Sequence, residues 1–217
     1  MPLASEPGSI WEYSRSIDVL AHLVEVISGM PIDRFLETRI FAPLGMKDTG
    51  FWVSEEKRDR LAEPFANDPG PGDPSRLIEV TKPPKLLSGN YGLVSTAEDY
   101  AHFMQMLINR GSFDGIGILG PKTVQYMTSD QIGTVRGPLY LPGPGYGFGI
   151  GFAVRLMVGQ APFPGSEGDY GWGGSAGTVF WVDPKEDLAA VFMAQRFGAA
   201  AHYSRLMRTL VYQSIEH

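Results

Sequence analysis

Apolar residues recur at helical spacing in the first part of the chain. Residues 14–28 carry such a pattern, and it ends at Gly29, a residue type that favours helix ends. Pro31 then opens a second pattern that stops near Pro43, and a short polar helix is predicted over residues 54–62. The apolar positions of the first two helices are Ile17, Leu20, Leu23, Val24 and Ile27, then Ile32, Phe35, Leu36 and Ile40.

Two more helices are predicted after a long stretch rich in proline and glycine. Residues 63–91 show no clear periodicity, and we interpret them as a loop that borders a pocket. Ser95 and Glu98 have the spacing of a capping box, which predicts the start of a helix that closes at Gly111. A further short helix is predicted over residues 121–127, because a proline opens it.

The period changes from helical to two in the last third of the chain. Apolar side chains alternate with small ones from residue 147 to 156, which predicts one strand. Residues 177–183 and 188–194 predict two more strands, and the short turn between them predicts a hairpin. A last helix is predicted over about 200–215.

This order of elements predicts an α+β fold: a helical region, then antiparallel strands, then a C-terminal helix that covers the sheet. It differs from the alternating strands and helices of a doubly wound fold. We divide the chain into residues 1–143, part of a helical domain, and residues 144–217, the C-terminal part of an antiparallel sheet domain.

Composition and charge exclude several classes of protein. The chain has 217 residues, of which 43% are hydrophobic and 19% charged, as in a folded globular protein. A net charge of -6 with no run of Lys or Arg argues against nucleic-acid binding. Absence of cysteine excludes disulfides and thiolate catalysis, and the isolated histidines lack the spacing of metal ligands, so neither a metal nor an organic cofactor is predicted. No apolar run is long enough to cross a membrane, and we predict a cytoplasmic location, although an export signal on a longer precursor would lie outside this sequence.

Two short motifs suggest a serine nucleophile. Ser175 lies in a literal G-x-S-x-G, the pattern of the nucleophile elbow, yet residues 178–182 after it read as a strand where the elbow requires a helix. Ser54 and Lys57 fit S-x-x-K, but their charged neighbours indicate a solvated helix in which the lysine stays protonated. We therefore favour neither motif as the nucleophile. Tyr13, which directly precedes the first predicted helix, is a better candidate for chemistry, because a helix N-terminus stabilises a phenolate.

Five blocks of sequence, in order, carry a resemblance to a known family: PGSIWEYSRSIDVLAHLVEVISG, FLETRIFAPLGMKDTGFWV, YGLVSTAEDYAHFMQML, GPGYGFGIGF and YGWGGSAGTVFWVDP. Together they resemble the serine β-lactamase-like superfamily, most closely the family VIII carboxylesterases, which are relatives of class C β-lactamases. The resemblance implies a partial β-lactamase-like fold. It corresponds to the C-terminal half of such an enzyme, without the S-x-x-K segment.

The resemblance also implies a site. Tyr13 would be the catalytic tyrosine, with Arg15 where the β-lactamases have asparagine. Trp172 opens a W-G-G strand in place of K-T-G, and the backbone N–H of Ser175 after it would contribute to an oxyanion hole. Trp172, Gly173 and Gly174 would bind the substrate. Tyr146 and Tyr170 are also assigned to substrate binding, as walls of the pocket, although core packing explains each of them nearly as well.

The function implied is hydrolysis of short-chain carboxylic esters through an acyl-serine intermediate. A tryptophan in place of the lysine removes a cation that could bind a β-lactam carboxylate, which favours neutral esters. We expect the chain alone to be inactive and to need a complement, namely its own missing half, another copy or a partner chain. Two alternatives stay open: a non-catalytic binding or structural fragment, and an esterase that uses Ser175.

Overall fold

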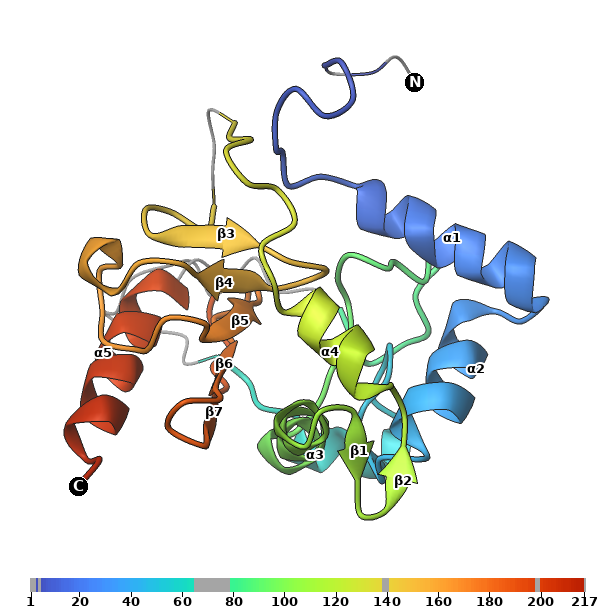
Figure 1. Cartoon of the computed structure of the whole chain (residues 1–217). Coiled ribbons are helices and arrows are strands. Elements are labelled where there is room, and N and C mark those ends of the chain that lie inside the picture. Colours follow the sequence, from blue (N-terminus) through green and yellow to red (C-terminus); the bar gives the residue numbers. More distant parts are fainter. Residues whose placement is uncertain (1–2, 4, 65–78, 138–140, 198–199, 217) are drawn as a thin grey trace.

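The computed structural model places helices on one side of the molecule and a five-stranded sheet on the other, with α5 against the sheet (Figure 1). It describes residues 3, 5–64, 79–137, 141–197 and 200–216. The predicted loop at 63–91 therefore lies partly outside the described residues. The α+β class and the order of helices, antiparallel strands and covering helix are confirmed.

The elements lie close to their predicted positions. The helices are α1 (Ser16–Ser28), α2 (Ile32–Leu36), η1 (Glu37–Phe41, a π-helix), η2 (Glu55–Arg60, a 3-10 helix), α3 (Ala97–Ile108), α4 (Pro121–Met127), η4 (Val158–Gln160, a 3-10 turn) and α5 (Ala200–Gln213). The strands are β1 (Ser112–Phe113), β2 (Ile116–Gly117), β3 (Tyr146–Phe148), β4 (Ala153–Arg155), β5 (Tyr170–Gly173), β6 (Val179–Asp183) and β7 (Leu188–Phe192). The small β1–β2 hairpin has too few residues to produce a periodic signal in the sequence.

Helix α1 ends where the sequence predicts, because Gly29 adopts a left-handed conformation with φ of 69° and its N–H caps the carbonyl of Glu25. Only one of its residues, Ala21, is buried, in a small cluster that also contains Ile32 and Phe51. Its apolar stripe instead faces outward. The exposed side chains are Val19 (68%), Leu20 (55%), Leu23 (50%), Val26 (66%) and Ile27 (77%), which we call the α1 stripe.

The start of α3 differs from the sequence prediction by one residue. Thr96, not Ser95, is the cap, and its hydroxyl accepts a hydrogen bond of 3.1 Å from the backbone N–H of Asp99. Ser95 instead hydrogen-bonds to the hydroxyl of Thr49 at 2.7 Å. The capping box of Ser95 and Glu98 is therefore wrong, because Ser95 has a partner from a distant segment that its local spacing does not reveal.

The strand predicted over 147–156 is in fact a hairpin. The chain reverses between β3 and β4, which pair antiparallel, with Phe148 opposite Ala153. Gly151 has φ of 89°, a conformation that side chains rarely adopt, and the N–H of Gly149 donates to the carbonyl of Phe152 at 2.8 Å. The alternating glycines that resemble the small face of one strand thus form the turn between two.

All five strands of the main sheet follow one another in sequence as an antiparallel meander, β3-β4-β5-β6-β7. Along β6 the side chains alternate between two packing partners. Phe180 contacts Tyr100 of α3, whereas Trp181 stacks on Tyr212 of α5. Both faces of this part of the sheet are therefore covered, and the larger hydrophobic core lies between the sheet and α3.

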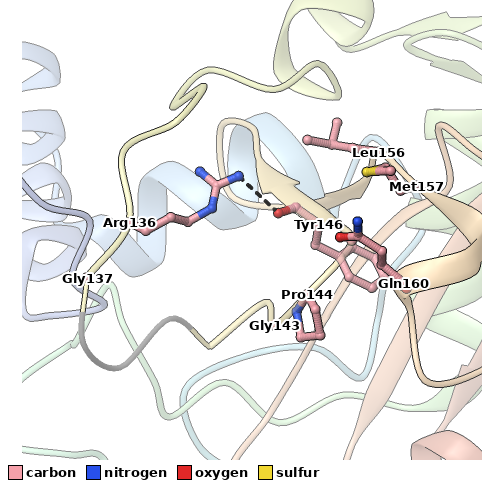
Figure 2. Close-up of a pocket in the computed structure, with 9 residues that line it drawn as sticks. Arg136, Gly137, Gly143, Pro144, Tyr146, Leu156, Met157 and Gln160 are labelled. Atoms are coloured by element: carbon pink, nitrogen blue, oxygen red, sulfur yellow. Dashed lines mark hydrogen bonds between the residues drawn. The ribbon is translucent and has the colours of Figure 1, made fainter.

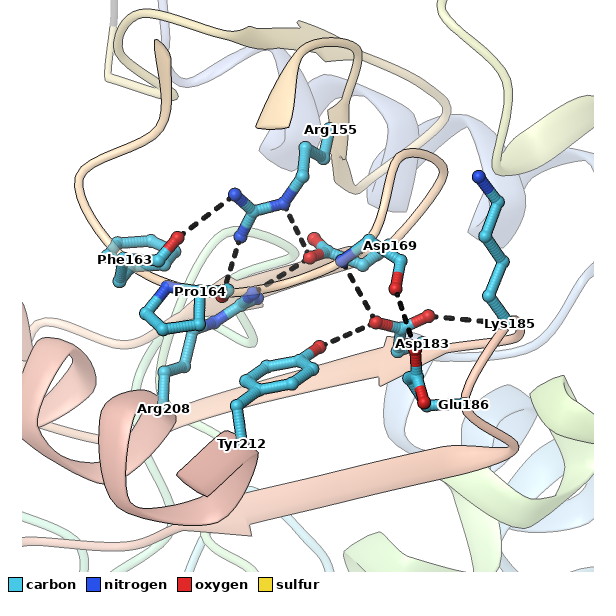
Figure 3. A network of polar contacts seen from close by, with 10 residues as sticks. Arg155, Phe163, Pro164, Asp169, Asp183, Lys185, Glu186, Arg208 and Tyr212 are labelled. Atoms are coloured by element: carbon cyan, nitrogen blue, oxygen red, sulfur yellow. Dashed lines mark hydrogen bonds and ion pairs between the residues drawn. The ribbon is translucent and has the colours of Figure 1, made fainter. Parts of the chain in front are cut away.

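A buried polar network connects the sheet with α5 (Figure 3). Asp169 is fully buried, and one of its oxygens accepts from Arg155 Nε at 2.6 Å and from Arg208 Nη1 at 3.1 Å. Burial raises the pKa of the Asp169 carboxyl, and the charges of Arg208 and Arg155 oppose that rise. Next to this triad, the hydroxyl of Tyr212 donates to the carboxylate of Asp183 at 2.7 Å, and burial raises the pKa of Tyr212. The covering helix is therefore held by charges as well as by apolar packing.

Candidate active site

Tyr13 lies in the extended segment that leads into α1, where Arg15 is the cap residue. Its side chain is 37% exposed. The ring packs against Trp172 on β5, with 5.4 Å between ring centroids. Two residues that the sequence analysis assigned to one site, although they lie in different parts of the chain, are thus in contact.

Two further aromatic rings adjoin this contact. Trp11 stacks on Tyr13 with centroids 6.4 Å apart and lies 5.1 Å from Phe148. Phe148 in turn meets Trp172 edge to face at 5.1 Å, which closes a cycle of four contacts. We call Trp11, Tyr13, Phe148 and Trp172 the four-ring cluster. Centroid separations of about 4.5–7 Å are those of favourable aromatic pairs, so each ring helps to fix the position of its neighbours.

The backbone also holds Trp11 in place. A Cβ atom at Gly137 would overlap the carbonyl oxygen of Trp11, so the segment that contains Gly137 passes directly against the Trp11 backbone. Only glycine permits an approach this close. The N-terminal segment is therefore located by a backbone contact in addition to the rings.

The turn between β5 and β6 presents the backbone of Ser175. Gly174 N–H donates to the carbonyl of Thr178 at 2.9 Å, and a Cβ at Gly174 would overlap the hydroxyl of Thr178. Gly177, with φ of 98°, completes the turn. Ser175 itself is exposed, and within the described part of the chain its N–H has no hydrogen-bond acceptor. This amide is available to an oxygen atom of a bound molecule, as an oxyanion hole requires.

The two remaining residues assigned to substrate binding, Tyr146 and Tyr170, are buried, with exposures of 5% and 2%. Burial raises the pKa of Tyr146 to about 12 and raises that of Tyr170 further. Tyr170 packs against Phe152 in the main core, with centroids 5.4 Å apart. Both phenols are neutral at ordinary pH, and contact with a substrate stays a prediction for each of them.

A second group of contacts fixes the loop beside α1. Asp18 accepts hydrogen bonds from the hydroxyl of Ser88 at 2.5 Å and from the backbone N–H of Asn90 at 3.2 Å. The Ser88 hydroxyl lowers the pKa of Asp18, and a hydrogen bond with Tyr91 raises the pKa of Arg15, whose guanidinium lies over the Tyr91 ring at 5.4 Å. Arg15 is thus used to anchor this loop.

The structure around the two serine motifs does not favour either as a nucleophile. Ser175 is followed by β6 and not by a helix, which contradicts the elbow, as the sequence context indicates. Lys57 of the S-x-x-K motif forms an ion pair with Asp48, with Nζ and Oδ1 2.8 Å apart, and donates to the carbonyl of Lys47. A lysine amine held in an ion pair is poorly placed to act as a base for Ser54.

A cavity of about 430 Å³ lies beside β3, and Gly137 and Tyr146 are among the residues that line it (Figure 2). Neither Tyr13 nor Trp172 lines it. Arg136, its cationic residue, donates to the carbonyls of Gly133 at 2.6 Å, Val135 at 2.8 Å and Tyr146 at 3.5 Å. Its guanidinium is therefore occupied by backbone oxygens, and the cavity does not offer the chemistry of an ester-cleaving site.

The sequence analysis identified Tyr13, Trp172 and the glycine turn but assigned no role to Trp11 or Gly137. A lone tryptophan near a helix start has no local signal, and its partner Phe148 lies on a distant strand. Two further findings concern what the described residues do not contain: they hold no group of three His, Asp or Glu side chains suited to a metal ion, and none of their helices is long and apolar enough to span a membrane.

Comparisons with known proteins show which proteins this chain is similar to. The family model described as Beta-lactamase matches residues 1–212. Protein Rv1367c of Mycobacterium tuberculosis is 33% identical over 209 residues, which cover 90% of this chain and 51% of that protein. Esterase EstB of Burkholderia gladioli is 28% identical over 211 residues, which cover 88% of this chain and 51% of EstB.

Among solved structures, EstCE1, described as a hydrolase with promiscuous acyltransferase activity, superposes with a TM-score of 0.80 at 28% identity. The superposition covers 98% of this chain and 58% of EstCE1. The chain therefore spans little more than half the length of the proteins to which it is similar.

Proposed function

Since this chain belongs to the Beta-lactamase family, and so to the serine β-lactamase-like superfamily, we propose that it forms part of a serine hydrolase that cleaves short-chain carboxylic esters. The observation that supports the proposal is the contact between the ring of Tyr13 and that of Trp172, which lies on β5 three residues before the exposed residue Ser175. Esterase EstB, which is similar over 88% of this chain, favours esters as the substrate class, and EstCE1, a hydrolase with acyltransferase activity, favours acyl transfer.

In the proposed reaction a serine hydroxyl attacks the ester carbonyl carbon. Tyr13, the proposed general base, accepts the hydroxyl proton at its phenolic oxygen and passes it to the oxygen of the departing alcohol. The backbone N–H of Ser175 donates to the negative oxygen of the tetrahedral intermediate, an interaction worth about 3 kcal/mol for a well-placed donor. Water then releases the acid from the acyl-serine.

We propose that none of the described residues near Tyr13 supplies the attacking serine, and that it lies in the remaining half of the fold. Within the described part of the chain no serine hydroxyl hydrogen-bonds to a lysine amine, the pair that the family uses. We propose that the α1 stripe binds the remaining half of the fold, since EstB and EstCE1 both extend well beyond the matched region. An exposed apolar helix face of this kind favours association.

The test uses p-nitrophenyl butyrate and two proteins: the isolated chain, and a chimera in which this chain replaces the matched half of EstB. We expect turnover by the chimera only. Tyr13→Phe, which keeps the ring and removes the hydroxyl, should lower the chimera's kcat at least about 100-fold, the usual range for loss of a general base. Circular dichroism would confirm that the variant is folded.

The controls separate the alternatives. A phosphonate probe that labels serine nucleophiles should label the chimera and not the isolated chain. Burst kinetics in the isolated chain that survive Ser54→Ala and disappear with Ser175→Ala would contradict the proposal. A folded chimera that keeps full activity with Tyr13→Phe would exclude Tyr13 as the base.

A further inference from the structure

The four-ring cluster is a group of aromatic side chains that are not fully buried in the main core. Trp11, Phe148 and Trp172 are half-buried, and Tyr13 is 37% exposed. Of the four, only Trp172 packs against the main core. Aromatic surface left open to solvent at a defined place on a protein is typical of a binding site.

The geometry of the rings limits what could bind. Adjacent centroids are 5.1–6.4 Å apart, so the rings pack on one another and leave no room for a ligand in their midst. A ligand would instead lie against their exposed faces and edges. Planar aryl groups gain most from such a surface, because they stack or meet rings edge to face.

The position of the cluster relative to the amide of Ser175 gives the surface a role. Tyr13 belongs to the cluster and is the proposed base, and Trp172 lies three residues before Ser175 at the turn. A molecule whose carbonyl oxygen binds the Ser175 N–H would therefore lie at the same end of β5 as the Trp172 ring.

We propose that the four-ring cluster is the subsite for an aryl group of the ester, and that Trp11 is a specificity-determining residue. This inference rests on the proposed function, since it names the substrate class of the same site. Trp11 supplies the largest ring that has no other assignment, and both Phe148 and the Gly137 backbone contact hold it in place. Because the surface is open, it favours aryl groups by attraction and does not exclude other groups by shape.

The experiment measures binding without turnover, so that its failure is distinct from failure of the proposed function. Butyranilide, an aryl amide that resists hydrolysis, is titrated into the isolated chain while the indole N–H signals of the four tryptophans are followed by NMR. N-ethylbutyramide, which lacks the ring, is the matched ligand. We expect butyranilide to shift the signals of Trp11 and Trp172, with a Kd at least about 5-fold lower than that of N-ethylbutyramide.

Variants assign the effect to Trp11. Trp11→Ala should raise the Kd for butyranilide about 2- to 10-fold, the equivalent of one aromatic contact. Trp11→Phe, which retains a ring, should restore most of the affinity. Trp52→Ala removes a tryptophan that is also 37% exposed but lies outside the cluster, and it should leave the Kd unchanged.

Three outcomes would overturn the inference: no saturable binding of butyranilide, equal affinity for the two ligands, or equal effects of Trp11→Ala and Trp52→Ala. If the isolated chain binds the aryl ligand selectively but the chimera shows no turnover, the subsite is supported and the proposed hydrolase function is contradicted. If the chimera shows turnover but the chain does not prefer the aryl ligand, the hydrolase function is supported and the aryl subsite is contradicted.

Discussion

The sheet with α5 and the region around α1 bury their side chains in different ways. In the sheet region Asp169, Arg155 and Arg208 are buried, and the carboxylate of Asp169 forms ion pairs with both arginines between the sheet and the covering helix. In the α1 region a single helical residue is buried and the α1 stripe is exposed. The side chains of the sheet region therefore contact one another inside the protein. The apolar side chains of the α1 stripe are instead exposed to solvent.

This difference indicates that the sheet region determines the stability of the chain, whereas the α1 stripe favours its association with another surface. A buried charge is tolerated only with its partners present, so the sheet region depends strongly on individual side chains. An exposed apolar side chain contributes little to the stability of the folded chain, but it favours contact with another surface. Substitutions in the two regions should therefore affect different measurements.

The largest effect is expected from Asp169→Ala. Its loss leaves Arg155 and Arg208 buried without a counter-charge, which should reduce the free energy of unfolding by about 3–5 kcal/mol. Urea unfolding followed by circular dichroism measures this. Asp59→Ala, at an exposed position, is the control and should change stability by less than about 0.5 kcal/mol. If both substitutions lowered the free energy of unfolding equally, the buried ion pairs of the sheet region would have no special role in stability.

A smaller effect is expected at Asp48, whose pKa the side chains of Arg60 and Lys57 lower to about 2. The carboxylate lies 2.7 Å from Arg60 and 2.8 Å from Lys57. Because its folded pKa is depressed, the stabilisation is present above the unfolded value of about 4 and is lost as the pH falls toward 2. Solvent screens these exposed partners, so the contribution should be about 1 kcal/mol or less.

Comparison of the wild type with Asp48→Asn between pH 6 and pH 2 tests this. The difference in unfolding free energy should be largest near pH 6 and shrink toward pH 2. A difference that grew as the pH fell would contradict the sign of the effect.

The smallest effect on stability is expected from the double substitution Leu23→Gln, Ile27→Gln in the α1 stripe. Both side chains are at least half exposed, and glutamine is a good helix former, so the free energy of unfolding should change by less than about 0.5 kcal/mol. Self-association, measured by analytical ultracentrifugation, should decrease. Val24→Gln on the half-buried side is the control and should instead destabilise the chain. Unchanged association in the double variant would show that the stripe is not a contact surface.

Much of the fold could be predicted because its signals are local. Gly29 ends α1, Pro121 opens α4, and a short turn joins β6 to β7, each at the predicted place. The secondary-structure predictions were wrong where one local sequence pattern is compatible with two different structures. Alternating glycines fit one face of a strand as well as the turn that Gly151 actually makes.

The site was only partly predictable for the same reason. The sequence contains Tyr13 and the W-G-G strand as recognisable motifs, and the structure places their rings in contact. Trp11 and Phe148 meet only because the fold brings their segments together, and no periodicity encodes such a contact. The triad of Asp169 and two arginines is likewise a product of tertiary structure, since Asp169 and Arg208 lie 39 residues apart.

The meander of β3 to β7 has a consequence for the order in which the molecule forms. Every strand pairs with its neighbour in sequence, so the sheet closes only short loops and can fold early at a low entropic cost. The contacts of Trp11 with Phe148 and of Tyr13 with Trp172 each close a loop of more than half of the chain, and closure of so long a loop is slow. The surface that carries the chemistry is therefore expected to assemble last, on a scaffold that is already rigid.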